Sequence, residues 1–460
     1  MQTPHVLVIG GGFAGVAAAA SLHAGGIAVT LLDDRHTLGG RARSDALAGL
    51  MVDTGAQFIA SSFSRTVHLL ARAAASREEL GGSTRADEVP IGLHVTPGRD
   101  ALLRDDTRHP LQYGSVRSLL SFSGLGAVEK MKLGAYLLPL LARHRTELDA
   151  GAGPIPASLD REAARAYVAS RIDERAADLF VEPPLNSFST TRGREASLAF
   201  FLMLGKYGTE SELLAPGAGW SGVIGGVLRG VTHVPNARVS ALALPDGGGV
   251  LARAEDGREW GGDGAIVATG PRTASILLAP HLAAADPLLH WLESIELRQS
   301  WTLALALDMP LRRDVFGIFQ DVRHARAVSA CAIYSAKLGG AAPADRDVVL
   351  AWPTPDAASQ LAGQPSETIV AAMMPEIEQL VPDARGHVTR ARLYRFDEGT
   401  PVALPGFAAD RQRGRALSEQ LAIPVALAGD YLTAPLIEGA VASGERAASR
   451  LLATLAGDGV

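Results

Sequence analysis

A glycine-rich turn near the N-terminus constrains the fold of this chain more than any other feature. The apolar run at residues 5–10, His-Val-Leu-Val-Ile-Gly, has the composition of a strand that is buried on both faces of a parallel sheet. Residues 11–24 then predict a helix, and residues 27–32 predict a second buried strand. Because parallel neighbours are joined by a right-handed crossover, this stretch predicts one β-α-β unit.

The turn itself indicates what the unit binds. Residues 10–15, Gly-Gly-Gly-Phe-Ala-Gly, match the pattern G-x-G-x-x-G directly after the predicted strand. Gly10 permits the tight turn, Gly12 lets the backbone approach a pyrophosphate, and Gly15 lets helix and strand pack closely. Asp33 ends the second strand, where its carboxylate can accept a hydrogen bond from a ribose hydroxyl. The sequence therefore predicts a dinucleotide site, with the anion at the helix N-terminus.

A second glycine-rich segment favours FAD over NAD as the dinucleotide. Residues 38–43, Leu-Gly-Gly-Arg-Ala-Arg, follow shortly after Asp33, and the run 52–58 comes next. The glycines allow this loop to fold over a phosphate, and the planar guanidinium of Arg41 can bind that phosphate through two hydrogen bonds.

Composition and charge narrow the class of protein. The 460 residues suggest roughly three folding units at about 150 residues each. Hydrophobic residues make up 47% of the chain and charged residues 20%, which is enough apolar material for a large core. The net charge is −6 without any block of like charges, so we expect no nucleic-acid partner.

Cysteine content and hydropathy predict a location inside the cell. The single cysteine, Cys331, excludes an intrachain disulfide and fits a reducing compartment. The N-terminus runs directly into a predicted strand rather than a secretory signal. The most lipid-like stretch, residues 133–142, contains a glycine and a proline and is far shorter than the roughly 20 residues that span a bilayer. We therefore expect a cytoplasmic protein.

The order of patterns along the chain predicts an α/β fold with a discontinuous parallel sheet. After a helical stretch with Gly/Pro-rich breaks, a hairpin is predicted at residues 237–255 and a last parallel strand at 425–429, followed by a helix. We predict a Rossmann-like FAD-binding domain, a mixed-sheet substrate domain and an inserted helical region. The predicted segments are residues 1–60, 231–275 and 401–460 for FAD binding, 61–230 for the substrate and helical region, and 276–400 for the substrate-binding domain.

Taken with two C-terminal segments, these motifs resemble the flavin-containing amine oxidase superfamily, which includes monoamine oxidases, protoporphyrinogen oxidases and phytoene desaturases. The C-terminal segments are residues 427–430, Leu-Ala-Gly-Asp, and residues 437–444. The resemblance implies FAD as the cofactor. Covalent attachment in this family uses a cysteine near the C-terminus, and Cys331 is not placed there, so we expect non-covalent FAD.

The resemblance also implies roles for individual residues. Asp430 would bond the ribityl or phosphate portion of the flavin, the backbone of residues 438–440 would cap the isoalloxazine, and Val239 would meet the adenine. Asp33 stands where the family usually has glutamate, so its reach is one methylene shorter. The full set of predicted cofactor residues is Gly10, Gly12, Phe13, Ala14, Gly15, Asp33, Asp34, Arg35, Gly40, Arg41, Gly55, Ala56, Val239, Ala268, Gly270, Gly429, Asp430, Glu438, Gly439 and Ala440.

Two departures lower the rank of simple amine oxidation. Similar monoamine oxidases carry a lysine on the strand that matches residues 300–307, where this chain reads Ser-Trp-Thr-Leu-Ala-Leu-Ala-Leu. At residues 396–401 a phenylalanine, Phe396, replaces the tryptophan of the family's W-x-x-A-x-P segment, which argues against an aromatic amine cage.

The inserted region is most similar to that of protoporphyrinogen oxidases. Arg99 aligns with an arginine proposed to hold a substrate carboxylate in that group, and Trp220, Trp352 and Phe396 are candidate pocket walls. The apolar stretches at residues 131–141 and 198–204 could line a tunnel, rest against a membrane surface or simply pack in the core.

The resulting functional prediction is an FAD-dependent dehydrogenase or oxidase that takes a hydride from a bulky hydrophobic substrate and forms a C=C or C=N bond. Flavin chemistry asks little of protein acids and bases, so no catalytic residue is predicted. The alternatives are an amine oxidase of the same fold and a flavin-bound, non-catalytic partner protein at a membrane. No residues have the spacing of a metal site. We expect a small hydrophobic substrate as the binding partner and allow for peripheral contact with the inner face of a membrane. The sequence leaves the oligomeric state open.

Overall fold

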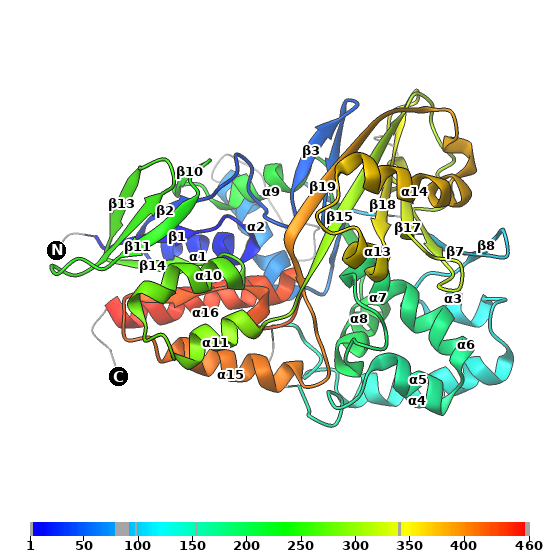
Figure 1. Ribbon diagram of the computed structural model, residues 1–460, viewed down its shortest axis with the longest axis horizontal. Coiled ribbons are helices and arrows are strands. Elements are labelled where there is room, and N and C mark those ends of the chain that lie inside the picture. Colours follow the sequence, from blue (N-terminus) through cyan, green and yellow to red (C-terminus); the bar gives the residue numbers. More distant parts are fainter. Residues whose placement is uncertain (1–2, 79–91, 97–98, 152–154, 339–341, 456–460) are drawn as a thin grey trace.

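The computed structural model describes residues 3–78, 92–96, 99–151, 155–338 and 342–455. Figure 1 shows two lobes side by side, joined by the long strands β15 (Leu297–Leu307) and β19 (Val388–Pro401). Both termini lie in the lobe that contains the blue N-terminal strands and the red C-terminal helix.

A parallel five-stranded sheet forms the centre of this first lobe. Its strand order is β10-β2-β1-β14-β20, and every neighbouring pair is parallel. The strands are β10 (Thr232–Val234), β2 (Ala28–Leu32), β1 (His5–Ile9), β14 (Gly264–Val267) and β20 (Val425–Leu427). Each of the three segments predicted to bind FAD contributes at least one strand to this sheet. The exact boundaries of these segments remain predictions.

The sheet is buried on both faces, as its apolar strands require. Val6 and Val8 of β1 face α1 (Phe13–Ala24) and α16 (Ile437–Leu455), while Leu7 and Ile9 face the opposite core. The helices α1 and α16 approach so closely that a Cβ on Gly444 would collide with the backbone oxygen of Ala14. The first and last helices of the chain are therefore packed against each other beneath one sheet.

The opposite face is covered by a small antiparallel sheet and three helices (Figure 1). The hairpin predicted at residues 237–255 is confirmed, because β11 and β12 pair antiparallel. The covering elements are β11 (Val239–Ala243), β12 (Val250–Ala254), β13 (Glu259–Gly262), α10 (Pro271–Leu278), α11 (Pro287–Ser294) and α15 (Phe407–Glu419).

The main sheet of the second lobe is mixed and has seven strands. Its order is β19-β15-β18-β17-β16-β7-β8, antiparallel except for the parallel pair of β16 and β7. The remaining strands are β18 (Asp347–Pro353), β17 (Val328–Ile333), β16 (Gly317–Gln320), β7 (Asp100–Arg104) and β8 (Thr107–Pro110). Three helices contact this sheet: α12 (Tyr334–Leu338), α13 (Pro355–Gln360) and α14 (Ser366–Leu380).

Helices of the inserted region lie under the other face of this sheet (Figure 1). They are α3 (Val116–Ser121), α4 (Ala127–Arg143), α5 (Ala164–Arg171), α6 (Glu174–Ala176), the π-helical turn η1 (Ala177–Val181), α7 (Glu182–Ser189) and α8 (Leu198–Glu210). The remaining elements are α2 (Ser64–Glu78), α9 (Trp220–Val227) and the short strands β3 (Ser44–Leu47), β4 (Leu50–Asp53), β5 (Ile59–Ala60), β6 (Leu93–Val95) and β9 (Leu213–Pro216).

The predicted fold class is confirmed. Within the region 61–230, β7 and β8 form a strand pair that ends at Pro110 and contributes two strands to the mixed sheet. Across the described part of the chain, no helix combines the length and apolar content needed to cross a bilayer.

Candidate active site

One cavity of about 1250 Å³ extends from the glycine turn of the first lobe to the inserted helices of the second. Sites for a single small ligand usually measure about 300–1,000 Å³, so this cavity has room for a dinucleotide and a second molecule. Most predicted residues line it: Gly10, Gly12, Phe13, Ala14, Asp33, Asp34, Arg35, Gly40, Arg41, Gly55, Ala56, Val239, Ala268, Gly270, Gly429, Asp430, Ala440, Trp352 and Phe396.

The glycine turn has the geometry that a dinucleotide requires. Gly10 has φ +107°, and a side chain there would press on the backbone oxygen of Ala268. Gly12 caps the N-terminus of α1 and presents bare backbone to the cavity. Gly15 lies outside the cavity, because its role is packing: a Cβ there would collide with the carbonyl oxygen of Gly10.

The loop predicted to cover a phosphate folds over this turn. Gly39 donates its N–H to the carbonyl of Gly11 at 2.9 Å, and both Gly39 and Gly40 have positive φ angles. Arg41, from the same loop, donates from Nη2 to Oδ1 of Asp430 at 2.7 Å and from Nη1 to the carbonyl of Gly399 at 2.8 Å. The guanidinium lines the cavity beside the C-terminal segment and adds positive charge next to the turn.

Asp33 is buried at the end of β2, and its carboxylate first organises the turn. Oδ2 accepts the N–H of Gly11 at 2.5 Å, and Oδ1 accepts the N–H of Arg35 at 2.8 Å. Burial raises the pKa of Asp33, while these two hydrogen bonds oppose the rise. Because each oxygen has a second lone pair, the carboxylate can still accept a ribose hydroxyl.

Glu438 points away from the cavity. Its fully buried carboxylate accepts the N–H groups of Arg65 and Thr66, both at 2.9 Å, and the hydroxyl of Thr66 at 2.7 Å, so it caps the start of α2. Gly439 does not line the cavity either, whereas Ala440, in the next position of α16, does. Of the segment predicted to cap the isoalloxazine, only Ala440 lines the cavity.

Two of the predicted substrate residues lie elsewhere. Trp220 is fully buried, donates from Nε1 to the carbonyl of Ala56 at 2.8 Å and packs edge-on against Phe13, so it supports the cofactor side instead of forming a pocket wall. Arg99 is exposed and lies outside the cavity, so its own guanidinium is not placed to hold a substrate carboxylate there. Its neighbour in sequence, Asp100, lines the cavity instead.

The mixed sheet supplies the wall of the second half of the cavity. Trp352 pairs with Ala330, and Ala330 pairs with Phe319, so these three side chains share one face. Asp100 pairs with Gly317, two residues before Phe319, and lies on the same face. Phe396, at the other end of this wall, packs under the guanidinium of Arg43 at 4.7 Å.

Asp100 was not predicted from the sequence. Its Oδ1 accepts the N–H of Gly317 at 3.2 Å, the one hydrogen bond that this carboxylate makes among the described residues. Burial raises the pKa of Asp100 to about 7. Its strand, β7, is three strand spacings from β18, which carries Trp352, or roughly 14 Å. An acidic residue at the start of a strand carries no sequence signal that distinguishes it from a surface carboxylate.

A buried ion pair lies next to the part of the cavity that contains the glycine turn, which we call the cofactor half. This pair was not predicted from the sequence. The ammonium of Lys337 and the carboxylate of Asp53 are fully buried and in direct contact. Gln57, which lines the cavity, donates to the carbonyls of Asp53 and Gly55, both at 2.8 Å. Burial lowers the pKa of Lys337, and the Asp53 carboxylate opposes that effect. The pair therefore fixes the segment 53–57 that borders the cavity.

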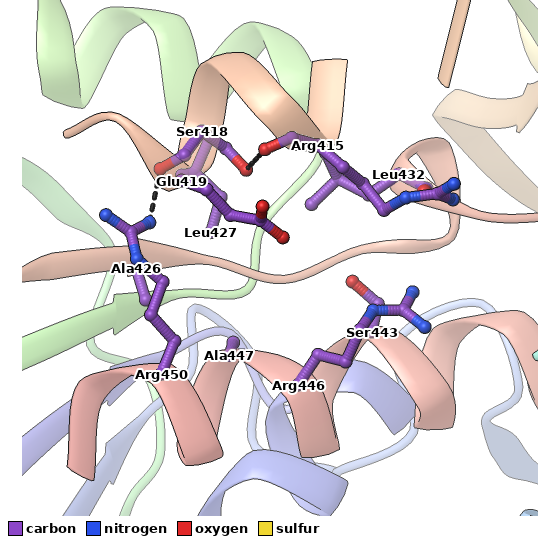
Figure 2. Close-up of a pocket in the computed structure, with 10 residues that line it drawn as sticks. All are labelled: Arg415, Ser418, Glu419, Ala426, Leu427, Leu432, Ser443, Arg446, Ala447 and Arg450. Carbon is purple, nitrogen blue, oxygen red and sulfur yellow. Dashed lines mark hydrogen bonds between the residues drawn. The ribbon is translucent and has the colours of Figure 1, made fainter. Parts of the chain in front are cut away.

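A second, much smaller cavity of about 40 Å³ lies between α15 and α16 (Figure 2). Two of its three arginines bind backbone carbonyls: Arg415 donates to Leu432 at 2.9 Å, and Arg450 donates to Ser418 and, at 3.1 Å, to Leu421. These contacts close the end of α15, and the space is too small for a dinucleotide. The large cavity is the candidate active site.

Solved structures of known proteins share this fold. A proposed protoporphyrinogen oxidase from Exiguobacterium sp. 255-15 superposes with a TM-score of 0.72 at 18% identity, covering 98% of each chain. Wild-type putrescine oxidase bound to putrescine gives 0.70 at 17% identity, covering 98% of this chain and 99% of that one. At these identities the likeness shows the fold.

Sequence comparison identifies the family. A stretch of 56 residues is 46% identical to Polyamine oxidase 5 of Oryza sativa subsp. japonica, but it spans only 12% of this chain and 11% of that protein. The sequence profile of the family described as flavin containing amine oxidoreductase matches residues 13–452. The bare glycine turn, Asp33 and the Arg41–Asp430 pair fit the FAD that this family binds. The chain belongs to the flavin-containing amine oxidoreductase family and is an FAD-dependent oxidoreductase.

Proposed function

We propose that this enzyme removes a hydride from a carbon of a bulky, largely apolar substrate and forms a C=C or C=N bond. The observation that carries the proposal is the lining of the second half of the cavity. Its wall on the sheet includes Phe319, Ala330 and Trp352, and the inserted helices supply further apolar side chains. These are Leu133, Leu137, Leu141, Phe180, Phe188 and Phe201.

The chain's own residues would bind and orient the substrate and would exclude water from it. Bound FAD supplies the hydride acceptor. The apolar side chains would hold a substrate by burying its surface. The wall formed by the mixed sheet would fix the distance between the substrate and the part of the cavity that holds FAD. Ser300 and Thr190, whose hydroxyls are 3.0 Å apart in the cavity lining, can orient a polar substituent beside Phe396.

Amine oxidation is the second candidate, and Asp100 favours it. A carboxylate at the far end of an apolar cavity can pair with a substrate ammonium. Against it, Lys130 is the one lysine in the described cavity lining and lies on α4, not on the central strand β15.

Anaerobic mixing of the holoenzyme with candidate substrates tests the proposal. The panel contains a porphyrinogen, a polyene precursor, a polyamine and an aromatic amine, and the readout is bleaching of the visible flavin band. We expect bleaching by one of the first two compounds and none by the amines. Bleaching by amines alone would establish the second candidate, and an FAD-loaded protein that no compound bleaches would favour a non-catalytic flavoprotein.

A cavity-filling variant links the reaction to the assigned cavity. Ala330→Trp adds bulk at the centre of the sheet wall, away from the glycine turn. We expect it to retain FAD and to lose bleaching by the bulky substrate. Equal rates for Ala330→Trp and wild type would place the substrate elsewhere.

We further propose that FAD is held without a covalent bond. Cys331 is fully buried in β17, and burial raises the pKa of its thiol, which disfavours the thiolate that would attack a flavin. Acid precipitation is expected to leave the yellow colour in the supernatant, and a yellow pellet would contradict the proposal.

A further inference from the structure

Large apolar side chains are exposed together on α3 and α4. Leu120 is 63% exposed, Val128 60% and Met131 67%, and Val116, Tyr136 and Leu138 are each more than 40% exposed. Exposed apolar residues scattered singly are ordinary on a protein surface, whereas a contiguous group marks an interaction site. We call these six residues the α3–α4 face.

Packing orients this face outward. On the opposite side of α4, Leu133 and Leu137 are buried against the inserted helices. The ammonium of Lys130 donates to the carbonyl of Leu120 at 2.8 Å, which ties α4 to α3. The exposed side chains are therefore presented by two connected helices whose other faces are anchored in the core.

The same face surrounds one opening of the active-site cavity. Val116, Leu120, Met131 and Leu138 are exposed and also line the cavity, as does Phe188, which is 57% exposed. An apolar molecule that entered between these residues would keep contact with apolar side chains from the surface to the sheet wall. The exposed patch and the cavity are one continuous apolar surface.

Charge distinguishes this segment from the rest of the chain. Residues 116–143 contain four basic residues and one acidic residue, a local net charge of +3, whereas the whole chain carries −6. The four are Arg117, Lys130, Lys132 and Arg143; the acidic residue, Glu129, caps the start of α4 by accepting the N–H of Gly126. Apolar side chains flanked by basic ones complement the interface of a bilayer that contains anionic lipids.

We propose that the α3–α4 face docks on the surface of an anionic lipid bilayer and that the cavity opens there toward the acyl chains. The apolar side chains would enter the boundary between headgroups and acyl chains, and Arg117, Lys132 and Arg143 would lie at the level of the phosphates, while Lys130 stays bound to the carbonyl of Leu120. The proposal concerns how the protein is placed and holds for either candidate reaction.

Vesicle flotation of the FAD-loaded protein tests this proposal. The vesicles are pure phosphatidylcholine or phosphatidylcholine with phosphatidylglycerol. We expect binding to the anionic vesicles that weakens with added salt, and much weaker binding to the neutral ones. The double variant Val128→Glu/Tyr136→Glu is expected to lower binding at least tenfold while the flavin spectrum stays unchanged, because these two exposed residues of the face do not line the cavity.

The matched control lies on the other lobe. Ile276 on α10 is 65% exposed, and Ile276→Glu adds one like charge away from the α3–α4 face (Figure 1). It is expected to bind as the wild type does. Arg117→Gln/Lys132→Gln is expected to weaken binding to anionic vesicles by up to about fivefold for each charge removed and to reduce the salt dependence.

Three results would overturn the proposal. The first is failure of the wild type to float with anionic vesicles, and the second is an equal loss for Ile276→Glu and the double variant. The third is a concentration-dependent dimer without vesicles that Val128→Glu/Tyr136→Glu abolishes, since the face would then join two copies of the chain.

Discussion

The guanidinium of Arg41 and the carboxylate of Asp430 are joined by a 2.7 Å hydrogen bond although 389 residues separate them in the chain. Asp430 is buried beyond the last strand of the parallel sheet, and Arg41 belongs to the loop that covers the glycine turn. The pair therefore closes the cofactor half of the cavity between the first and last segments of the chain.

Removal of this pair is expected to weaken FAD binding. Asp430→Asn keeps the shape but removes the charge that holds Arg41, and hydrogen bonds to charged groups contribute about 1.5–3 kcal/mol, so we expect a loss of affinity of about tenfold or more. FAD content by absorbance and the FAD dissociation constant measure it. The control is Arg392→Met, which breaks the more exposed pair with Asp45. Equal affinity for Asp430→Asn and wild type would show that the pair does not hold the cofactor.

Gly15→Ala is expected to destabilise the β-α-β unit. The added Cβ would collide with the carbonyl oxygen of Gly10, and overpacking of this kind costs about 1–3 kcal/mol or more. Gly225→Ala in α9 is the matched control, because its Cβ meets no atom within 4 Å and should gain about 0.5–1 kcal/mol from helix propensity. Urea unfolding measures both, and a Gly15→Ala protein as stable as the wild type would contradict the observed packing.

Stability is expected to depend on pH through Asp100. Burial raises its pKa to about 7 in the folded protein, from an ordinary value of 3.8, so the folded state binds more protons than the unfolded state between these values. The free energy of unfolding therefore falls as pH rises from about 4 to 7, by at most about 1.4 kcal/mol per pH unit from this group.

Asp100→Asn isolates that contribution. The amide cannot ionise, so the variant is expected to gain stability relative to the wild type at pH 8 and to gain little or nothing at pH 4. Urea unfolding of both proteins at the two pH values gives the difference. A stability difference that is the same at both pH values would show that Asp100 titrates normally.

The buried pair of Lys337 and Asp53 predicts a strong asymmetry between single and double variants. Lys337→Met leaves the buried carboxylate unpaired and is expected to cost about 3–5 kcal/mol. Lys337→Met/Asp53→Asn should recover much of that loss, because no buried charge remains. Arg253→Met at the exposed pair with Glu259 is the control and should change the free energy of unfolding by less than about 1 kcal/mol. Additive losses in the double variant would argue against coupling of Lys337 and Asp53.

Local signals explain which parts of the cofactor half were predictable. The turn at residues 10–15 needs glycine for φ angles and close contacts that other residues do not allow, so its sequence reports its geometry directly. Asp33 follows because it ends the neighbouring strand. Glu438 shows the limit of this reasoning: its position next to the cofactor was predicted, but its side chain caps α2, which is far away in sequence.

The sequence by itself determined the parallel sheet, the dinucleotide turn and the family, because strand burial and glycine geometry are set by neighbours in the chain. The tertiary structure decided which side chains meet across the cavity. Asp100 rather than Arg99 faces it because strand β7 pairs with β16 in a register that turns alternate residues to opposite sides. Lys337 meets Asp53, and the α3–α4 face surrounds the opening, through packing between segments that are distant in sequence. Such contacts depend on the whole fold, so no local pattern could predict them.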